Sequence, residues 1–523
     1  MSARPTDRLD HYLRWRCQLD DPFVELDLSY SALDEGVMSS LQPKLRAALT
    51  AMQALEGGSI ANQDEQRMVG HYWLRAPGLA PTDDLQQAIV NTLAVIELFA
   101  ADVHSGKLTA SGGGRFRQVL LCGIGGSALG PMLLGGVFGG KAAPMQLCVL
   151  DNTDPDGIDR QLAALGSLQD ALVIVISKSG STKETRNGML ELQRAFAAQK
   201  LPFGKHAVAV TQDGSTLDQV AKREQWLACM PMWDWIGGRT SVMSSVGLLP
   251  GALLGMDLRA FLAGAAAMDE AGRRTEINKN PAAMLAAFWH AEGKGRGERA
   301  MVVLPYKDRL LLLSRYLQQL VMESVGKEFD RAGQAVNQGI AVYGNKGSTD
   351  QHAYVQQLRC GRHDFFAVFV RVLQDRDGAS FEVESGATSG DFLDGFWQGT
   401  RKALLENGRA SASLCCERLD ERVLGALIAL FERAVGIYAE LINVNAYDQP
   451  GVEAGKKAAA EVLTLQKKLH LVLTDEMRDV RSLAKSVGAD PADCWPILCH
   501  LAANNRAHRI GEPDPRLAKF ARA

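Results

Sequence analysis

Short apolar runs, each followed by an amphipathic stretch, recur through the middle of the chain. Runs such as "QVLLC", "ALVIVI" and "HAVAV" have the length and β-branched content of buried strands. The segments after them repeat apolar residues every three or four positions, as amphipathic helices do. This alternation predicts a parallel sheet with helices on both faces. It occupies residues 118–136, 146–165, 171–199 and 206–224.

A second series of the same kind begins at "ERAMVVLPY" and continues through residues 363–374 to a helical segment at 423–447. Two α/β domains are therefore expected, each a parallel-sheet α/β/α sandwich with flanking helices. The expected boundaries are a mostly helical N-terminal segment 1–85, a first domain 86–275, a second domain 276–457 and a helical C-terminal extension 458–523.

Two loops follow strands of the first series: residues 123–127, "GIGGS", called here the glycine loop, and residues 177–182, "SKSGST", the phosphate loop. Ligands of open parallel sheets bind at the carboxyl ends of the strands, where helix N-termini present free N–H groups. The hydroxyls of Ser179, Ser181 and Thr182 can surround a phosphate together with such groups and without a metal. Each hydrogen bond to a charged group contributes about 1.5–3 kcal/mol. A small phosphorylated ligand is therefore expected.

Nucleotide-binding motifs fit these two loops less well. Gly123, Gly125 and Gly126 do not complete the GxGxxG pattern of dinucleotide-binding folds, and no GK[ST] sequence follows to make a Walker loop. Either loop alone is also compatible with a tight turn that binds nothing. At equivalent positions of one sheet, the two together favour a sugar-phosphate site.

Composition limits the possible partners. The net charge of -3 and the pI near 6.4 leave no basic surplus for a nucleic-acid backbone or an anionic membrane. No continuous apolar run of about 18 residues is present, so no membrane span is expected. The nine cysteines form no CxxC pair and no signal-peptide core is visible at the start, which predicts reduced thiols in the cytoplasm. Cys494, Cys499 and His500 lack the spacing of a zinc site, so no metal is expected.

A set of motifs resembles one enzyme family. The segments "CGIGGSALGP", "ISKSGSTKET", "WIGGRTSVMSSVGLLP", "MESVGKE", "STDQHAYVQQL" and "YDQPGVEAGK" are similar, in the same order, to segments of glucose-6-phosphate isomerases. "MVGHYWLR" and the C-terminal extension resemble the cyanobacterial and plant-plastid branch in particular. The resemblance implies two sugar-isomerase (SIS-type) domains. It also implies interconversion of glucose 6-phosphate and fructose 6-phosphate through a cis-enediol(ate), with no metal or organic cofactor.

The resemblance assigns catalytic roles to four residues. Glu323 matches the carboxylate base that moves a proton between C2 and C1 of the sugar. His352 matches the ring-opening histidine, which in the family comes from the other subunit and so implies a homodimer. Lys456 matches the lysine that assists ring opening, and Arg239 the cation that stabilises the enediolate.

Substrate and phosphate contacts are also implied. They are expected from Gly126, Ser127, Ser177, Lys178, Ser179, Ser181, Thr182, Gln319 and Gln449.

Two alternatives share most of these features. An isomerase for another sugar phosphate, such as mannose 6-phosphate, or one with dual specificity would use the same loops and base. A non-catalytic sugar-phosphate sensor would need only the loops, so Glu323 and His352 argue against it. The C-terminal segment 482–505 resembles a helix-turn-helix but carries few lysines or arginines, so we expect a structural cap and no nucleic-acid partner.

Overall fold

The computed structural model describes residues 8–63, 65–511 and 514–523, without the side chains of residues 452–454 and 456. These residues form two compact units, one ending at Asp448 and the other beginning at Gln449. Each unit has its own hydrophobic core.

The first sheet of the larger unit has the strand order β6-β5-β7-β8-β9, and every strand pair in it is parallel. Its strands are β5 (Gln118–Cys122), β6 (Gln146–Leu150), β7 (Ala171–Ile176), β8 (Ala207–Thr211) and β9 (Ala228–Pro231). The residues of β7 are all buried, as its unbroken apolar sequence predicts. The strand, loop and helix alternation expected across residues 118–224 is confirmed. The short strand β9 was not predicted.

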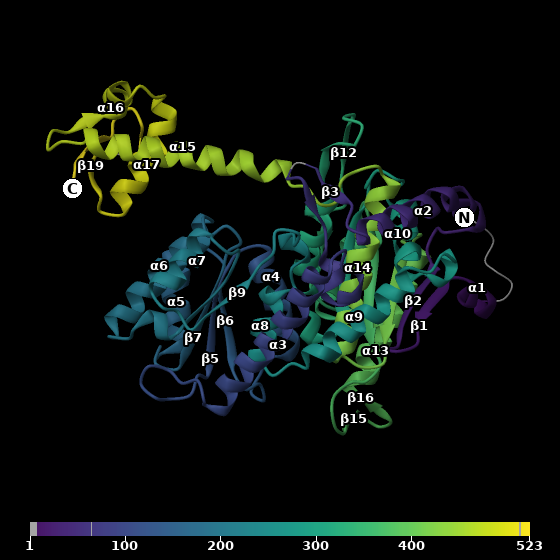
Figure 1. Cartoon of the computed structure of the whole chain (residues 1–523). Coiled ribbons are helices and arrows are strands. Elements are labelled where there is room, and N and C mark those ends of the chain that lie inside the picture. The colour runs from purple at the N-terminus through teal and green to yellow at the C-terminus, as the bar shows by residue number, and fades with distance from the viewer. Residues whose placement is uncertain (1–7, 64, 512–513) are drawn as a thin grey trace. The chain divides into compact units, whose positions relative to one another are not determined.

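Helices cover both faces of this sheet (Figure 1). Val173 and Val175 pack in one core with residues of the α5, α6 and α7 layer, while Ile174 and Ile176 pack in another with the α3, α4 and α8 layer. The helices are α3 (Asp83–Ser105), α4 (Gly126–Phe138), α5 (Pro155–Leu165), α6 (Lys183–Ala198), α7 (Thr216–Arg223) and α8 (Ser245–Leu253), with the 3₁₀ turns η3 (Phe203–Lys205) and η4 (Gly238–Thr240).

The second sheet has the order β1-β2-β17-β14-β10-β13. Its strands are β1 (Arg16–Leu19), β2 (Val24–Tyr30), β10 (Ala300–Tyr306), β13 (Val342–Tyr343), β14 (Phe365–Val372) and β17 (Ser411–Cys416). The strands β13, β10, β14 and β17 are parallel, as expected. The N-terminal strands β2 and β1 extend this sheet with antiparallel pairs. The segment expected to be mostly helical therefore also completes a sheet whose other strands lie far along the chain.

Helices also cover both faces of the second sheet. Phe366 and Val368 belong to the core that includes α9, α10 and α14, whereas Phe365 and Phe369 pack with residues of α12 and α13. These helices are α9 (Leu258–Gly272), α10 (Pro281–Glu292), α12 (Val355–Cys360), α13 (Ser389–Glu406) and α14 (Glu421–Leu441). The expected α/β class is confirmed. The division of the larger unit into two sugar-isomerase domains stays a prediction, which the two sheets support.

The remaining elements of the larger unit are short or peripheral. They are α1 (Arg8–Arg14), α2 (Glu35–Glu56), β3 (Ile60–Asn62), β4 (Arg67–Met68), η1 (His71–Leu74), η2 (Pro77–Leu79), η5 (Ile277–Lys279), η6 (Asp308–Leu310), α11 (Leu313–Leu317), η7 (Gln318–Glu323), β11 (Lys327–Phe329), β12 (Ala335–Gln338), η8 (Thr349–His352), β15 (Glu382–Glu384) and β16 (Ala387–Thr388).

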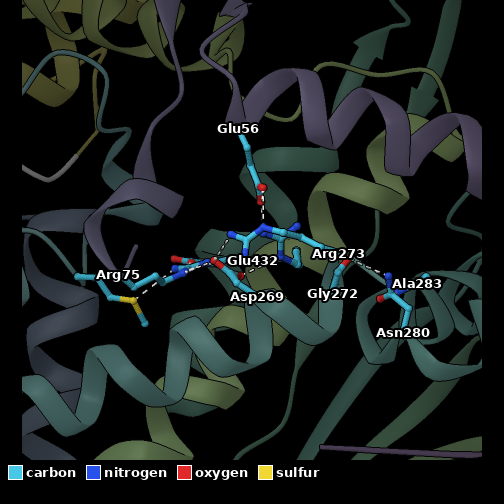
Figure 2. A network of polar contacts seen from close by, with 10 residues as sticks. Glu56, Arg75, Asp269, Gly272, Arg273, Asn280, Ala283 and Glu432 are labelled. Carbon is cyan, nitrogen blue, oxygen red and sulfur yellow. Dashed lines mark hydrogen bonds and ion pairs between the residues drawn. The ribbon is translucent and has the colours of Figure 1, made fainter. Parts of the chain in front are cut away.

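A buried ion network joins the N-terminal segment to α9 and α14 (Figure 2). Arg75 donates to Asp269 Oδ2 at 2.7 Å, and Arg433 donates to Asp269 Oδ1 at 2.8 Å. Arg75 also pairs with Glu432, and Arg433 with Glu56. Burial alone would raise the pKa of Asp269, but the two arginines lower it to about 2. Removing one partner from such a network leaves an uncompensated buried charge, so the network holds these segments in one arrangement.

One described helix is long and apolar enough to cross a membrane by length and composition. This helix is α3. Its Ile89, Ile96 and Val103 are buried in the larger unit. A single helix of this kind is weak evidence for a span, because core helices and signal sequences meet the same criteria.

The smaller unit combines helices with a sheet. The two expected C-terminal helices are present and are joined by a turn in which Gly488 is left-handed. The sheet, of order β18-β20-β19, was not predicted. Helix α17 exposes Asp493, Pro496 and His500, and its sequence contains no lysine or arginine. The elements are α15 (Pro450–Val472), β18 (Arg478–Asp479), α16 (Val480–Val487), α17 (Pro491–Ala503), β19 (Ala507–Ile510) and β20 (Lys519–Arg522).

Candidate active site

The glycine loop and the phosphate loop both lie at the carboxyl edge of the first sheet, after β5 and β7. The helices that follow them, α4 and α6, have no side-chain hydrogen bond at their N-caps. By contrast, α5 and α7 are capped by the side chains of Asp154 and Ser215. The first N–H groups of an uncapped helix need an outside acceptor. The two loops expected to bind a phosphate are therefore followed by helices with open N-termini.

The hydroxyl groups of the phosphate loop converge. Ser179 Oγ lies 2.8 Å from Ser181 Oγ and accepts a hydrogen bond from Ser181 N at 3.2 Å. The buried Ser177 accepts from Gly180 N at 3.1 Å and lies 3.4 Å from Thr182 Oγ1. Ser179 and Ser181 are exposed, so these hydroxyls face outward while Ser177 supports the turn from below.

Gly180 is required by the shape of this loop. Its φ is +70°, a conformation that residues with a side chain rarely adopt. A Cβ atom at this position would lie 2.3 Å from the backbone nitrogen of Leu217. The loop therefore packs tightly on α7 at this residue.

Lys178 connects the phosphate loop to the turn that carries Arg239. Its Nζ donates to the carbonyl oxygens of Asp234 at 2.6 Å and Ile236 at 3.0 Å. Burial lowers the pKa of Lys178 to about 8. Gly70, in the N-terminal segment, donates its N–H to the carbonyl of Trp235 in the same turn at 3.1 Å. The turn is thus held from two sides.

The turn around Arg239 touches the glycine loop backbone to backbone. A Cβ atom on Gly126 would lie 2.0 Å from the carbonyl oxygen of Gly238. Ser241 Oγ donates to the Gly126 carbonyl at 3.3 Å. Only glycine permits so close an approach at position 126, so the predicted residues Gly126 and Arg239 are brought together by this contact.

Arg239 is buried, and carbonyl groups hold its guanidinium in place. It donates to the carbonyl oxygens of Ala446 at 3.1 Å and Asp448 at 3.0 Å. Its Nε lies 3.7 Å from Glu323 Oε2. Burial lowers the pKa of Arg239, and Glu323 and Asp448 oppose that effect. The arginine is therefore a fixed cation beside the predicted base.

Glu323 ends a π-helical segment, η7 (Gln318–Glu323). Its Oε2 atom is buried and accepts no hydrogen bond from the described residues. A buried carboxylate oxygen without a donor is rare in folded proteins, and short π-helical segments often occur at functional sites. The amide nitrogen of Gln319 lies 3.3 Å from the position of a Cβ on Gly125. The predicted Gln319 is therefore next to the glycine loop.

Two residues of this site were missed by the sequence analysis. Lys327 and Asp448 form an ion pair of 2.7 Å, with 5% and 18% of their side chains exposed. Lys327 Nζ also donates to the carbonyl oxygens of Glu323 at 3.1 Å and Asp448 at 2.9 Å. Burial lowers the pKa of Lys327. Both residues stand inside family motifs, "MESVGKE" and "YDQPGVEAGK", which is the signal that could have found them.

His352 is not joined to this cluster by any contact among the described residues. It is exposed at the end of η8, whereas its neighbours are anchored. The buried Asp350 accepts a hydrogen bond from Asn345 N at 2.8 Å. Gln351 donates to Tyr306 Oη at 3.2 Å. The turn is therefore held by hydrogen bonds of the two residues that precede the exposed histidine.

The other predicted residues lie in or directly before two different helices. Ser127 is half-buried in the first turn of α4. Gln449 is exposed at the N-cap of α15, in the smaller unit. Lys456 lies within α15, but its side chain is outside the described residues. Within the described part of the chain, no cluster of three His, Cys, Asp or Glu side chains could hold a metal ion.

Comparison with known proteins identifies the family. The family model described as phosphoglucose isomerase matches residues 27–395 and 399–476. The chain belongs to this family. A glucose-6-phosphate isomerase from Citrifermentans bemidjiense is 56% identical over 92% of this chain and 93% of its own length. The enzyme of that name from the cyanobacterium Synechococcus elongatus is 56% identical over 95% of this chain and 96% of its own.

Solved structures agree with the family assignment. The crystal structure of a glucose-6-phosphate isomerase from Chlamydia trachomatis aligns with a TM-score of 0.79 and 25% identity, covering 88% of this chain and 91% of that one. The resemblance predicted from the motifs, including that to cyanobacterial members, is confirmed. The family match ends at residue 476, so most of the smaller unit lies beyond it.

Proposed function

We propose that this protein interconverts D-glucose 6-phosphate and D-fructose 6-phosphate through a cis-enediol(ate), as an aldose–ketose isomerase of glycolysis and gluconeogenesis. The observation that carries the proposal is the pairing of Glu323 and Arg239 beside the glycine loop. The Glu323 oxygen nearest Arg239 is buried and accepts no hydrogen bond from the described residues. It is therefore free to accept a proton from a carbon acid, which forms no strong hydrogen bond in the ground state.

The proposed chemistry uses the groups of this cluster in sequence. The phosphate loop and the open N-terminus of α6 bind the substrate phosphate. The Glu323 carboxylate removes the C2 proton of the open-chain aldose. The C–H electron pair forms the C1–C2 double bond while the π electrons of the C1 carbonyl move to O1. Negative charge then develops on the oxygen atoms, where Arg239 stabilises it more than it stabilises the neutral sugar. Transfer of the O2 hydroxyl proton to O1 restores a carbonyl group at C2, and protonated Glu323 returns its proton to C1, which gives the ketose.

Ring opening requires an acid and base on the sugar oxygens, which we assign to His352 and Lys456. His352 is exposed on a turn held by hydrogen bonds, and it contacts none of the other predicted residues whose side chains the structure describes. That placement supports a homodimer in which each His352 serves the site of the partner subunit. Gln319 and Gln449 are proposed to bind the sugar hydroxyls. The nine cysteines are unpaired, which supports the proposed location in the cytoplasm.

Glu323→Gln tests the base. The variant keeps the shape of the side chain and removes its basicity, so turnover of fructose 6-phosphate is expected to fall by about 10²–10⁴-fold or more. Product is measured with a coupled glucose 6-phosphate dehydrogenase. Glu328→Gln, an exposed glutamate in β11, is the matched control and is expected to retain native turnover. Near-native turnover of a folded Glu323→Gln protein would refute the assignment.

Mixing two inactive variants tests the shared site. Glu323→Gln and His352→Ala proteins are unfolded together and refolded. Random pairing makes half of the dimers mixed, each with one intact site, so about a quarter of the native activity should return. No recovery, with mixed dimers present, would show that His352 does not act across the interface.

A further inference from the structure

A cavity of about 400 Å³ lies at the carboxyl edge of the second sheet. We call it the edge cavity. It is formed by the loops that follow β10, β14 and β17, the first turns of α9 and α14, and the end of α4. The lining residues are Phe138, Asp257, Ala260, Lys307, Arg309, Gln374, Arg376, Asp377, Arg418, Leu419, Asp420, Glu421 and Arg422. None of them belongs to the candidate active site.

The position of the edge cavity matches that of the phosphate loop in the other sheet. The strand order β6-β5-β7-β8 of the first sheet corresponds to β13-β10-β14-β17 of the second, and all these strands are parallel. The glycine and phosphate loops follow β5 and β7, and the edge cavity is lined by the loops that follow β10 and β14. Open parallel sheets bind ligands at this edge because strand ends and loops meet there.

Two cations of the edge cavity are held by backbone carbonyl groups. Lys307 Nζ donates to the carbonyl oxygens of Gln374 at 2.9 Å and Asp375 at 2.5 Å. Arg309 likewise donates to carbonyl oxygens, those of Val137 and Leu419. These contacts fix the two cations without neutralising them.

A third cation, Arg376, is exposed and makes no ion pair within the described part of the chain. Arg418 and Arg422 differ, because they pair with Asp420 and Asp21. The edge cavity thus has both anchored and free positive charge.

Most carboxylates of the edge cavity are engaged with backbone. Asp257 accepts from Ala260 N at 2.9 Å and caps α9. Asp420 accepts from Val423 N at 2.9 Å and caps α14. Glu421 accepts from Asp257 N at 3.4 Å. These acids offset the partial positive charge of helix N-termini rather than that of Lys307, Arg309 or Arg376.

Asp377 is the exception, since it forms no ion pair or side-chain hydrogen bond among the described residues. It lies beside Arg376 in the chain and contributes to the same lining. Its negative charge opposes the binding of any anion there. Removing the negative charge of Asp377 should therefore strengthen anion binding in the edge cavity.

We propose that the edge cavity is a second anion site, which binds a small phosphorylated molecule through Lys307 and Arg376. Its volume lies within the range of about 300–1,000 Å³ usual for small-ligand pockets. The ligand differs from that of the active site in how it is held: long cationic side chains bind it, in place of hydroxyls and an open helix N-terminus. The site is independent of the proposed isomerisation.

Binding of inorganic pyrophosphate, measured by titration calorimetry, tests the proposal. A Ser179→Ala, Ser181→Ala double variant serves as the background, because it weakens binding at the phosphate loop. In this background, one equivalent of pyrophosphate should still bind. Adding Arg376→Gln should weaken its affinity by about 10-fold or more. Asp377→Asn should strengthen it several-fold. Lys307→Met should also weaken it, with a thermal melt to confirm that the protein is folded.

The control is Arg362→Gln, which removes an exposed arginine at the amino end of β14, the opposite edge of the same sheet. It should not change pyrophosphate binding. The proposal fails if the background binds no pyrophosphate, or if Arg376→Gln and Arg362→Gln bind it equally well. Coupled turnover of Arg376→Gln in the otherwise native chain should equal that of the native protein, which separates this site from the isomerase reaction.

Discussion

The carboxyl edges of the two sheets have the same strand order but present different chemistry. After β5 and β7 the chain supplies glycines, hydroxyls and helices without side-chain caps. After β17, α14 is capped by Asp420, and the loops after β10 and β14 carry Lys307, Arg309 and Arg376. The first edge presents backbone N–H and hydroxyl groups, whereas the second edge presents long cationic side chains, of which Lys307 and Arg309 are anchored by carbonyl groups and Arg376 is exposed. The same strand order thus supports two modes of anion binding.

The second sheet also supplies the proposed base. The segment after β10 leads through η6 and α11 into η7, which carries Glu323 and Gln319. Gln319 reaches the glycine loop of the first sheet, and Glu323 faces Arg239 from η4. The loops of the first edge are therefore proposed to bind the substrate, and the second half of the larger unit supplies the base. Both functions can act on one substrate only because the two halves approach closely.

The largest effect on activity is expected from a substitution at the contact between the glycine loop and the turn that carries Arg239. Gly126→Ala would place a methyl group 2.0 Å from the Gly238 carbonyl, so both backbones must separate. A displacement of about 1 Å in an active site can lower the rate about 10²-fold. We expect a loss of that size in kcat/KM, measured by the coupled assay.

Gly112→Ala is the control for this variant, because nothing lies within 4 Å of a Cβ at that position. It should have native activity. If Gly126→Ala were as active as Gly112→Ala, the close approach of the two loops would have no bearing on catalysis, and the comparison of a binding edge with a reacting half would lose its main support.

A smaller effect is expected from the binding edge alone. Ser179→Ala and Ser181→Ala each remove one hydroxyl from the phosphate loop, so each should raise KM for fructose 6-phosphate by about 10-fold or more. The change in kcat should be smaller, because phosphate is bound in both the ground state and the transition state. Ser39→Ala, on the exposed surface of α2, is the control. Equal losses in kcat and kcat/KM would instead place these hydroxyls in the reaction step.

The sequence predicted the first sheet better than the second. The strands β5 to β8 are short, mainly apolar runs, and each is followed by a short loop and then by its helix. The strand β17 has the sequence "SASLCC". Its polar Ser411 and Ser413 are buried, so the sequence lacks the continuous apolar pattern that predicts a core strand. Strand β2 pairs with β17, almost four hundred residues away, for example Leu26 with Leu414, and β1 joins the sheet only through β2. Local patterns do not carry such long-range pairing.

The site was predicted where motifs are contiguous and missed where contacts are distant. The phosphate loop and Glu323 stand inside recognisable segments. The ion pair of Lys327 with Asp448 joins residues 121 positions apart, so neither segment alone indicates it. The π-helical form of η7 was also missed, because its residues have the apolar spacing of an ordinary helix. These features depend on tertiary packing rather than on local preference.

The smallest effect is expected from the charge of Lys178, the cation of the otherwise uncharged phosphate loop. Burial lowers its pKa to about 8, with Arg67 also lowering it and Glu65 and Asp234 raising it. A lysine loses its positive charge as the pH rises through its pKa. The free enzyme should therefore bind the substrate dianion less well above pH 8, and kcat/KM should fall about fourfold between pH 7 and 8.5.

Lys178→Arg separates this effect from other titrations. Arginine keeps its charge throughout this range, so the fall in kcat/KM above pH 8 should disappear even if the activity is lower at every pH. Lys183→Arg, an exposed residue at the start of α6, should keep the native pH profile. A fall that persists unchanged in Lys178→Arg would assign the titration to another group. The binding edge would then act through hydroxyl and backbone donors alone, which would make its contrast with the cation-lined edge cavity complete.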